Sequence, residues 1–372
     1  MGILLMNIVS FSMPSDAYVN PAAYGGAEAA DAASWAAMFV LVDSKMRGLF
    51  TILFGASMLL IYERAEAAGE DGARVHRRRM GWLLVFGLLH YFLIWWGDIL
   101  TLYALCGLAG MSLLLFDPGE LRRTAIWAIG GNFVLLAGLV ATLYWQEMPA
   151  FDPEGVIAEL ELHRGGYAGI LFDRFGENLF DPLELILLNG PETIGLMAIG
   201  MMLLRNGFLT GEWDSARYRA LMWRAYAIGI PGSIALALWV WSTGFEGLAT
   251  LGTFLAWSLP FRIATTLGHA ALAMLAIRRF AGGALLLRIE AAGQAAFSNY
   301  LGTSILMSLL FNGYGFGLFG HLTRWQAYCV APAMWILMLL WSKPWLDRFR
   351  YGPFEWAWRS LARGSLQKMR LQ

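Results

Sequence analysis

Long apolar segments alternate with short polar gaps along nearly the whole chain of 372 residues. Most of these segments are close to the roughly 20 residues that a helix needs to cross about 30 Å of hydrocarbon. The pattern therefore predicts an all-α, polytopic membrane protein, a single transmembrane domain over residues 1–372 with about ten spanning helices. The predicted spans are residues 1–13, 36–62, 80–96, 99–116, 124–144, 185–204, 221–242, 250–276, 295–312 and 326–342.

The basic residues in the gaps predict how these helices are oriented. Of the 27 Lys and Arg residues, 21 lie in alternate gaps. These gaps are residues 63–79, 117–123, 205–224, 277–288 and 343–372. The intervening gaps contain only Arg164, Arg174 and Arg324. Because short loops rich in Lys and Arg stay in the cytoplasm, we expect both ends of the chain on the cytoplasmic side.

The composition agrees with a membrane protein and removes several other classes. Hydrophobic residues make up 58% of the chain, charged residues 15%, and the formal net charge is zero. This leaves no basic stripe for nucleic acid. Cys106 and Cys329 fall within predicted spans, which argues against a disulfide or a cysteine-based metal site. We therefore expect the lipid bilayer as the partner, with no metal and no tightly bound cofactor, while homo-oligomer formation stays open.

Two segments outside the spans are predicted to form surface helices. Residues 145–184 carry apolar side chains at helical spacing among acidic ones, so we expect an external amphipathic loop that caps a cavity. Residues 343–372 mix arginine with tryptophan and phenylalanine at helical spacing, which predicts a helix on the cytoplasmic membrane surface.

Five stretches of the sequence carry a resemblance to a known family. They are GILLMNIVSF, FTILFGASMLLIYERA, LLHYFLIWWGDILTLYALCGL, SNYLGTSILMSLLFNGYGFGLFG and RFRYGPFEWAWRSL. With these blocks the chain resembles the bacterial YeiB family, whose common domain is known as DUF418. The resemblance covers nearly the whole chain and implies the bacterial inner membrane. Because such proteins typically begin with a short cytoplasmic segment ending in Arg-Gly, it also predicts that this chain begins inside its first helix.

At the clan level the family is similar to transmembrane acyltransferases, among them the lysosomal enzyme that acetylates heparan sulfate glucosamine. In those relatives acyl-CoA enters from the cytoplasm as a co-substrate, and a polar cavity between helices brings it to an acceptor. The resemblance places Asn7 at the position of an asparagine in the first helix of the glucosaminide enzyme. The catalytic histidine about eleven residues later has no counterpart, since His76 is the first histidine of this chain.

Charged residues within the second predicted span suggest a binding site. Asp43 and Arg47 are four residues apart and share one helix face, with Lys45 turned away. An ionisable group in a span needs a partner or water. One interpretation is an internal Asp43–Arg47 ion pair with Lys45 snorkelling to the outer interface. The other is a cationic wall that binds an anionic substrate, such as a phosphate or a carboxylate.

His90 and Asp98 are the candidate catalytic residues. Eight residues separate them, so they share a face if the helix continues, at about 12 Å from one another. A histidine and a carboxylate facing one cavity could supply a general base for acyl transfer and a group that fixes its tautomer or binds the acceptor. A histidine bonded to a backbone carbonyl and a proton relay are the alternatives.

Further polar residues within the spans complete the candidate site. Arg262 follows Pro260, and it could clamp a phosphate or satisfy carbonyls exposed by a helix break. Glu192 lies beside Pro191 in a segment that resembles an interrupted helix lining a cavity. Asn299 adds hydrogen-bonding groups in the ninth predicted span. We expect a single water-accessible cavity to be shared by five of these polar residues: Asn7, Arg47, His90, Asp98 and Arg262.

Three classes of function remain open on the sequence. The first is a membrane-bound acyltransferase that moves an acyl group from cytoplasmic acyl-CoA to an acceptor in or across the membrane. The second is a transporter or flippase of a small anionic or amphipathic molecule, although the halves of the chain show no convincing internal repeat. The third is a membrane sensor or scaffold without catalytic turnover.

Overall fold

The computed structural model describes residues 1–26, 28–147 and 151–371. The chain is 78% helical, and the described ranges contain no strand, so the all-α prediction is confirmed. The first helices are α1 (Gly2–Ser12), α2 (Ser15–Val19), α3 (Ala29–Leu41), α4 (Lys45–Ala67), α5 (Gly72–Leu93), α6 (Leu100–Ala109), α7 (Pro118–Trp145), α8 (Pro153–Arg164) and α9 (Tyr167–Phe175). The later ones are α10 (Asp181–Arg205), α11 (Ser215–Ser242), α12 (Gly247–Gly252), α13 (Leu259–Arg279), α14 (Ala284–Gln294), α15 (Ala296–Phe311), α16 (Arg324–Leu346) and α17 (Pro353–Arg363).

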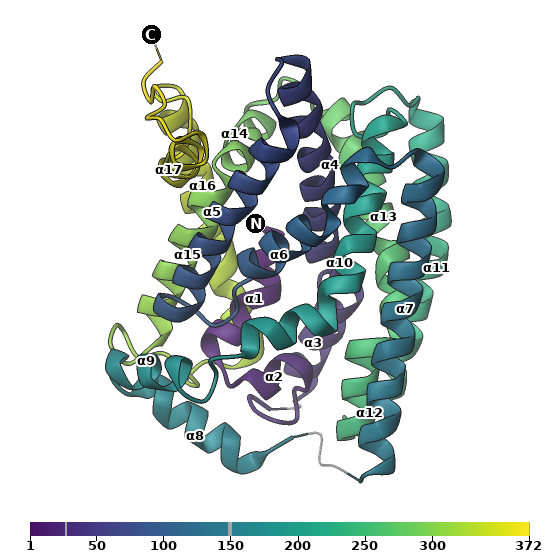
Figure 1. Ribbon diagram of the computed structural model, residues 1–372. Helices are drawn as coiled ribbons and strands as arrows, with labels where there is room; N and C mark the ends of the chain where they lie inside the picture. Colours follow the sequence, from purple (N-terminus) through teal and green to yellow (C-terminus); the bar gives the residue numbers. More distant parts are fainter. Residues whose placement is uncertain (27, 148–150, 372) are drawn as a thin grey trace.

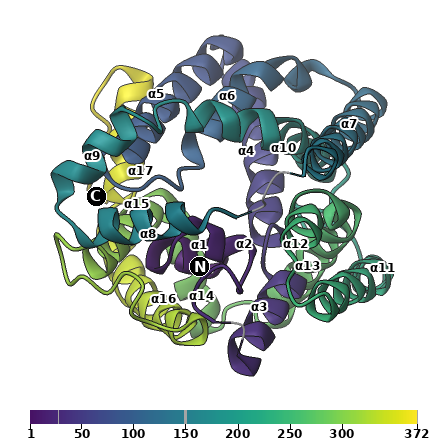
Figure 2. The same ribbon diagram turned by 90° about the horizontal axis from the view of Figure 1, so that it is seen from below.

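The long helices stand side by side as a bundle (Figure 1). Seen from below, α7, α11 and α13 form one side, α15 and α16 form the other, and α1 lies between them (Figure 2). The helices α8 and α9 lie across one end of the bundle, and α17 lies at the opposite end.

Within the described residues, five helices are long and apolar enough to cross a membrane: α7, α10, α11, α13 and α16. They correspond to the predicted spans 124–144, 185–204, 221–242, 250–276 and 326–342. The helices α4 and α5 have 23 and 22 residues and carry charged residues near their ends. The apolar helices α1 and α15 are shorter than a full span. The chain is therefore a helical membrane protein in which spans of full length and shorter apolar helices pack together.

The two predicted helix breaks, at Pro191 and Pro260, differ in outcome. The predicted span 250–276 is divided, because α12 passes into a π-helical segment (Thr253–Trp257) before α13 starts one residue ahead of Pro260. By contrast, α10 runs without interruption through Pro191. The interrupted helix predicted around Glu192 is therefore wrong, since the helix absorbs the missing hydrogen bond of the proline.

The segment 145–184 contains α8 and α9, while its residues 148–150 lie outside the described part of the chain. The Glu159 carboxylate accepts a hydrogen bond from the backbone N–H of Ser15 at 2.8 Å. The Tyr167 hydroxyl donates to the Leu93 carbonyl at 2.6 Å. These bonds tie the segment to the start of α2 and the end of α5.

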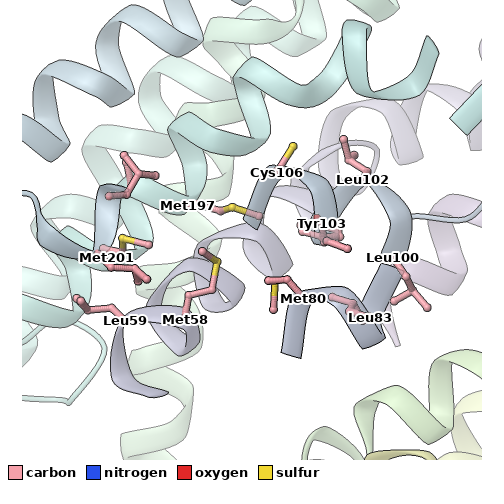
Figure 3. Close-up of a cluster of buried hydrophobic side chains, with 14 of the residues drawn as sticks. Met58, Leu59, Met80, Leu83, Leu100, Leu102, Tyr103, Cys106, Met197 and Met201 are labelled. Carbon is pink, nitrogen blue, oxygen red and sulfur yellow. The ribbon is translucent and has the colours of Figure 1, made fainter. Parts of the chain in front are cut away.

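A methionine-rich core joins α4, α5, α6 and α10 and extends to α7 and α15 (Figure 3). Met58 of α4, Met80 of α5 and Met197 of α10 are buried in it around Tyr103 of α6. Methionine side chains are flexible and fill irregular gaps. The helices α4 and α10 also approach closely, because a Cβ at Gly55 would clash with the backbone of Met197.

The C-terminal helix α17 is fixed to the bundle by a carboxylate. Glu355 Oε1 accepts hydrogen bonds from the backbone N–H groups of Phe297 at 2.6 Å and Ser298 at 3.0 Å, and Glu355 Oε2 accepts one from the Ser298 hydroxyl at 2.5 Å. The N–H groups at the start of a helix lack partners within that helix. Glu355 thus caps α15 from a different helix, which gives a physical role to the motif Tyr351–Trp356.

The substitution Glu355→Gln is expected to destabilise the protein by about 1–2 kcal/mol, because a neutral amide oxygen is a weaker acceptor than a carboxylate. Thermal unfolding in detergent measures the loss. Glu290→Gln on the neighbouring α14 is the matched control, since Glu290 is exposed and its replacement should change stability by less than about 0.5 kcal/mol. Equal stability of the two variants would contradict a capping role.

Candidate functional site

A cavity of about 630 Å³ lies between the N-terminal helix and the α4–α5 pair on one side and α14–α17 on the other. On α1 its lining extends from Met1 to Phe11, about 15 Å along the helix axis. His76 and Arg79, in the first two turns of α5, line one end of the cavity together with Arg359 of α17. The cavity therefore runs from the α17 end of the bundle toward its middle.

Basic and aromatic groups surround the α17 end of the cavity, called here the mouth. The Arg79 guanidinium lies over the Trp358 ring at 4.3 Å from its centroid, a cation–π contact that holds this arginine in place. His76 Nε2 is 2.8 Å from the Gly107 carbonyl oxygen, so that nitrogen donates. None of these mouth residues was a candidate from the sequence, although the block RFRYGPFEWAWRSL pointed to this region.

The remaining walls of the cavity differ in polarity. The helices α4 and α5 contribute mainly phenylalanine, leucine and methionine. The opposite wall is more polar: α14 ends in Gln294, and Asn299, Thr303 and Ser304 follow on α15. Asn299 is satisfied within the fold, since its Nδ2 donates to the Ala292 carbonyl at 2.9 Å and its Oδ1 accepts from the Trp341 indole at 2.9 Å. Asn7 of α1 also lines the cavity.

His90 and Asp98 are in direct contact, which corrects the predicted separation. His90 Nδ1 lies 2.9 Å from Asp98 Oδ1. The expectation of about 12 Å was wrong because α5 ends at Leu93 and the chain then turns back before α6 begins at Leu100. Gly87 permits this close approach, since a Cβ there would lie 2.5 Å from the backbone nitrogen of Thr101.

The geometry of the pair selects one tautomer of the histidine. Asp98 Oδ2 accepts a hydrogen bond from the Thr101 N–H at 2.7 Å, which orients the carboxylate. Because a carboxylate accepts, Nδ1 of His90 carries a proton, and in the neutral imidazole the lone pair is then on Nε2. His90 is 1% exposed, and Nε2 has no hydrogen-bond partner in the described residues. The His90–Asp98 and Asp98–Thr101 hydrogen bonds also join α5 to the start of α6. The pair therefore has a structural role, whether or not it is catalytic.

The pair lies next to the inner end of the large cavity. The ring of His90 packs against that of Tyr300, with 5.0 Å between the centroids. Tyr300 lines the cavity, as do Ile99 and Leu100, which directly follow Asp98 in the chain. Tyr300 thus contacts both the cavity and the His90 ring.

A second buried cluster is built from two arginines and one carboxylate. Glu192 Oε2 lies 3.0 Å from Arg47 Nη2 and 2.7 Å from Arg262 Nη2. Arg262 Nη1 additionally donates to the Phe254 and Leu255 carbonyls of the π-helical segment, at 3.0 and 3.2 Å. Arg262 therefore does satisfy carbonyls at a helix break, one of the two roles expected from the sequence.

The predicted Asp43–Arg47 ion pair is wrong. Ser44, with a φ of 62°, separates α3 from α4, so Asp43 and Arg47 do not share a helix. Lys45 is 1% exposed rather than at an interface. Its ammonium donates to the Phe39 carbonyl and lies 5.0 Å from the centroid of the Phe39 ring.

The candidate residues do not share one cavity. Asn7 and Asn299 line the large cavity, whereas Arg47 and Arg262 line a separate cavity of about 40 Å³ together with Asn189. His90 and Asp98 line neither of these two cavities. The expectation of a single shared cavity is therefore wrong, because Arg47 and Arg262 find their partner in Glu192 and His90 finds its partner in Asp98.

The fold and the cavity define a helical membrane protein with a large cavity between its helices and basic residues at the cavity mouth. The chain matches the family described as "Protein of unknown function (DUF418)" over residues 203–365. It is 32% identical to the uncharacterized protein YeiB of Escherichia coli (strain K12), over 97% of this chain and 92% of the relative. It is 30% identical to the uncharacterized protein YxaH of Bacillus subtilis (strain 168), over 96% and 90%. The chain belongs to the YeiB family. No solved structure matches it.

Proposed function

We propose that this protein is a membrane-bound acyltransferase that takes an acyl group from acyl-CoA on the cytoplasmic side of the bacterial inner membrane. One observation carries the proposal: a cavity of about 630 Å³ has Arg79 and Arg359 at its mouth and ends beside the His90–Asp98 pair. Arginines recognise phosphate groups, and a cavity of this size fits a cofactor-sized ligand.

The orientation follows from the basic residues and the ends of the bundle. The segment 343–372 carries 7 of the basic residues and contains α17, at the opposite end from α8 and α9. With both chain ends in the cytoplasm, the chain crosses about ten times, and 145–184 forms a cap on the outer side. The mouth then opens to the cytoplasm, where acyl-CoA is found.

The proposed reaction uses His90 as the general base. Nε2 takes the proton from an acceptor hydroxyl or amine, whose oxygen or nitrogen forms a bond to the thioester carbonyl carbon. The carbon–sulfur bond then breaks, and the CoA thiolate leaves and receives the proton. Asp98 holds the Nδ1–H tautomer, Asn7 donates to the carbonyl oxygen, and rotation of Tyr300 joins His90 to the cavity.

Ligand-induced stabilisation tests the binding step. Acetyl-CoA should raise the unfolding temperature of the purified protein, since a ligand that binds only the folded state stabilises it. Arg359→Gln should weaken binding about tenfold, because one charged contact to phosphate is lost. Arg363→Gln is the matched control: it lies on the same helix and does not line the cavity. If neither CoA nor acetyl-CoA nor a longer acyl-CoA stabilises the protein, the proposal is overturned.

A transporter is the second candidate, and the buried cluster of Arg47, Glu192 and Arg262 favours it. Charged groups beside an irregular helix within a membrane often mark a substrate pathway. In the same assay, stabilisation by small anions without any response to CoA would support transport. If neither small anions nor CoA compounds stabilise the protein, a membrane sensor or scaffold without turnover becomes the favoured class.

A further inference from the structure

The two faces of the large cavity differ in chemistry along their whole length. From α4 come Phe50, Leu53 and Phe54, with Met80 and Leu83 of α5 beside them. Across from this apolar face, Gln294 of α14 offers an amide. The hydroxyls of Thr303 and Ser304 on α15 donate to backbone carbonyls and can still accept a hydrogen bond. A ligand that fills the cavity therefore meets apolar side chains on one wall and a few hydrogen-bonding groups on the other.

The pantetheine arm of CoA matches only one of these faces. Its two amides need hydrogen-bond partners when they leave water. On the α14–α15 face, Gln294 can donate and accept, and the Thr303 and Ser304 hydroxyls can accept from an amide N–H. An acetyl group adds a single methyl, so an acetyl-CoA in this cavity would leave the α4–α5 face in contact with water. Covering apolar surface is favourable by about 0.8 kcal/mol for each buried methylene.

From these two faces we infer that the donor carries an acyl chain of medium or greater length, which folds back along the α4–α5 face while the pantetheine arm lies along α14 and α15. This inference builds on the proposed function and names its donor. Met58 and Met80 extend from this face into the core (Figure 3). Their flexible side chains can adapt to chains of different length.

Binding of an acyl-CoA series to the full chain in lipid nanodiscs tests the inference. Acetyl-, butanoyl-, hexanoyl- and octanoyl-CoA should bind progressively more tightly, by about fourfold for each added methylene, equivalent to ~0.8 kcal/mol. If acetyl- and octanoyl-CoA bind equally well, the inference fails while the proposed function stands. If CoA and all four thioesters fail to bind, the proposed function fails as well.

A cavity-filling variant distinguishes binding in the cavity from partition into the bilayer. Ser57 lines the cavity on α4 between Leu53 and Ile61. Ser57→Phe should therefore fill the space beside the apolar face and remove most of the increase in affinity between butanoyl-CoA and octanoyl-CoA. Two control variants should keep this increase in affinity. Ser57→Ala removes the hydroxyl without adding volume, and Ala141→Phe adds a phenyl ring at an exposed position of α7 outside the cavity. If Ser57→Phe also keeps the increase in affinity, the added methylenes are buried outside this cavity and the inference is overturned.

Discussion

His90→Asn is expected to lower acyl transfer by about 10²–10⁴-fold, the usual contribution of a general base. The asparagine Nδ2 lies near the position of the imidazole Nδ1, so it can still donate to Asp98 and keep α5 joined to α6. Thermal stability and CoA binding should therefore stay close to those of the unchanged protein. Release of free CoA from octanoyl-CoA in native membrane vesicles containing the protein measures the reaction.

His90→Ala provides the contrast. It leaves the Asp98 carboxylate, which is 3% exposed, without its partner, so stability and turnover should fall together. A catalytic role for His90 is refuted if His90→Asn releases CoA at a rate within twofold of the unchanged protein. The His90–Asp98 contact would then serve only to join α5 to α6.

Glu192→Gln is expected to destabilise the protein by about 3–5 kcal/mol, the usual effect of removing one partner from a buried ion pair. The side chains of Arg262 and Glu192 are 5% and 2% exposed. Without the carboxylate, two guanidinium groups would remain in a medium that solvates charge poorly. Denaturant titration in detergent micelles gives the free energy of unfolding.

Arg47→Gln is the matched comparison for this cluster. It leaves the contact between Arg262 and Glu192 at 2.7 Å intact and balances one positive charge with one negative charge. Its cost should therefore be about 1 kcal/mol, the value of one hydrogen bond. Equal losses for Glu192→Gln and Arg47→Gln would show that the charge balance of the cluster does not control stability.

The sequence predicted the helical membrane fold well, because hydrophobic length is a local property that a reader can count. The end of a helix is a weaker signal. The gap between the predicted spans 80–96 and 99–116 implied a turn, but the apolar Trp95 and Trp96 extended the predicted helix past its observed end at Leu93, so the contact of Asp98 with His90 was missed. Ser44 is a similar case, since nothing about a serine announces a left-handed backbone conformation.

Contacts between distant segments were beyond the reach of the sequence pattern. Arg47 and Glu192 are 145 residues apart, and each alone suggested only that a partner or water was needed. Arg47 and Glu192 meet because α4 and α10 cross closely at Gly55, a contact that the sequence pattern does not reveal. The mouth of the cavity was missed for the same reason, because Arg79 and Arg359 come from opposite ends of the chain.

The cap that Glu355 forms on α15 has a consequence for access to the cavity. Swinging α17 away would break three hydrogen bonds to a charged group, at a cost of roughly 4 kcal/mol or more. A displaced α17 would then be populated in fewer than about one molecule in 1,000. Trp358 of α17 also donates to the Arg79 carbonyl of α5. Arg359 and Trp358 therefore stay at the entrance in nearly all molecules, so a ligand must fit between side chains whose positions are already set.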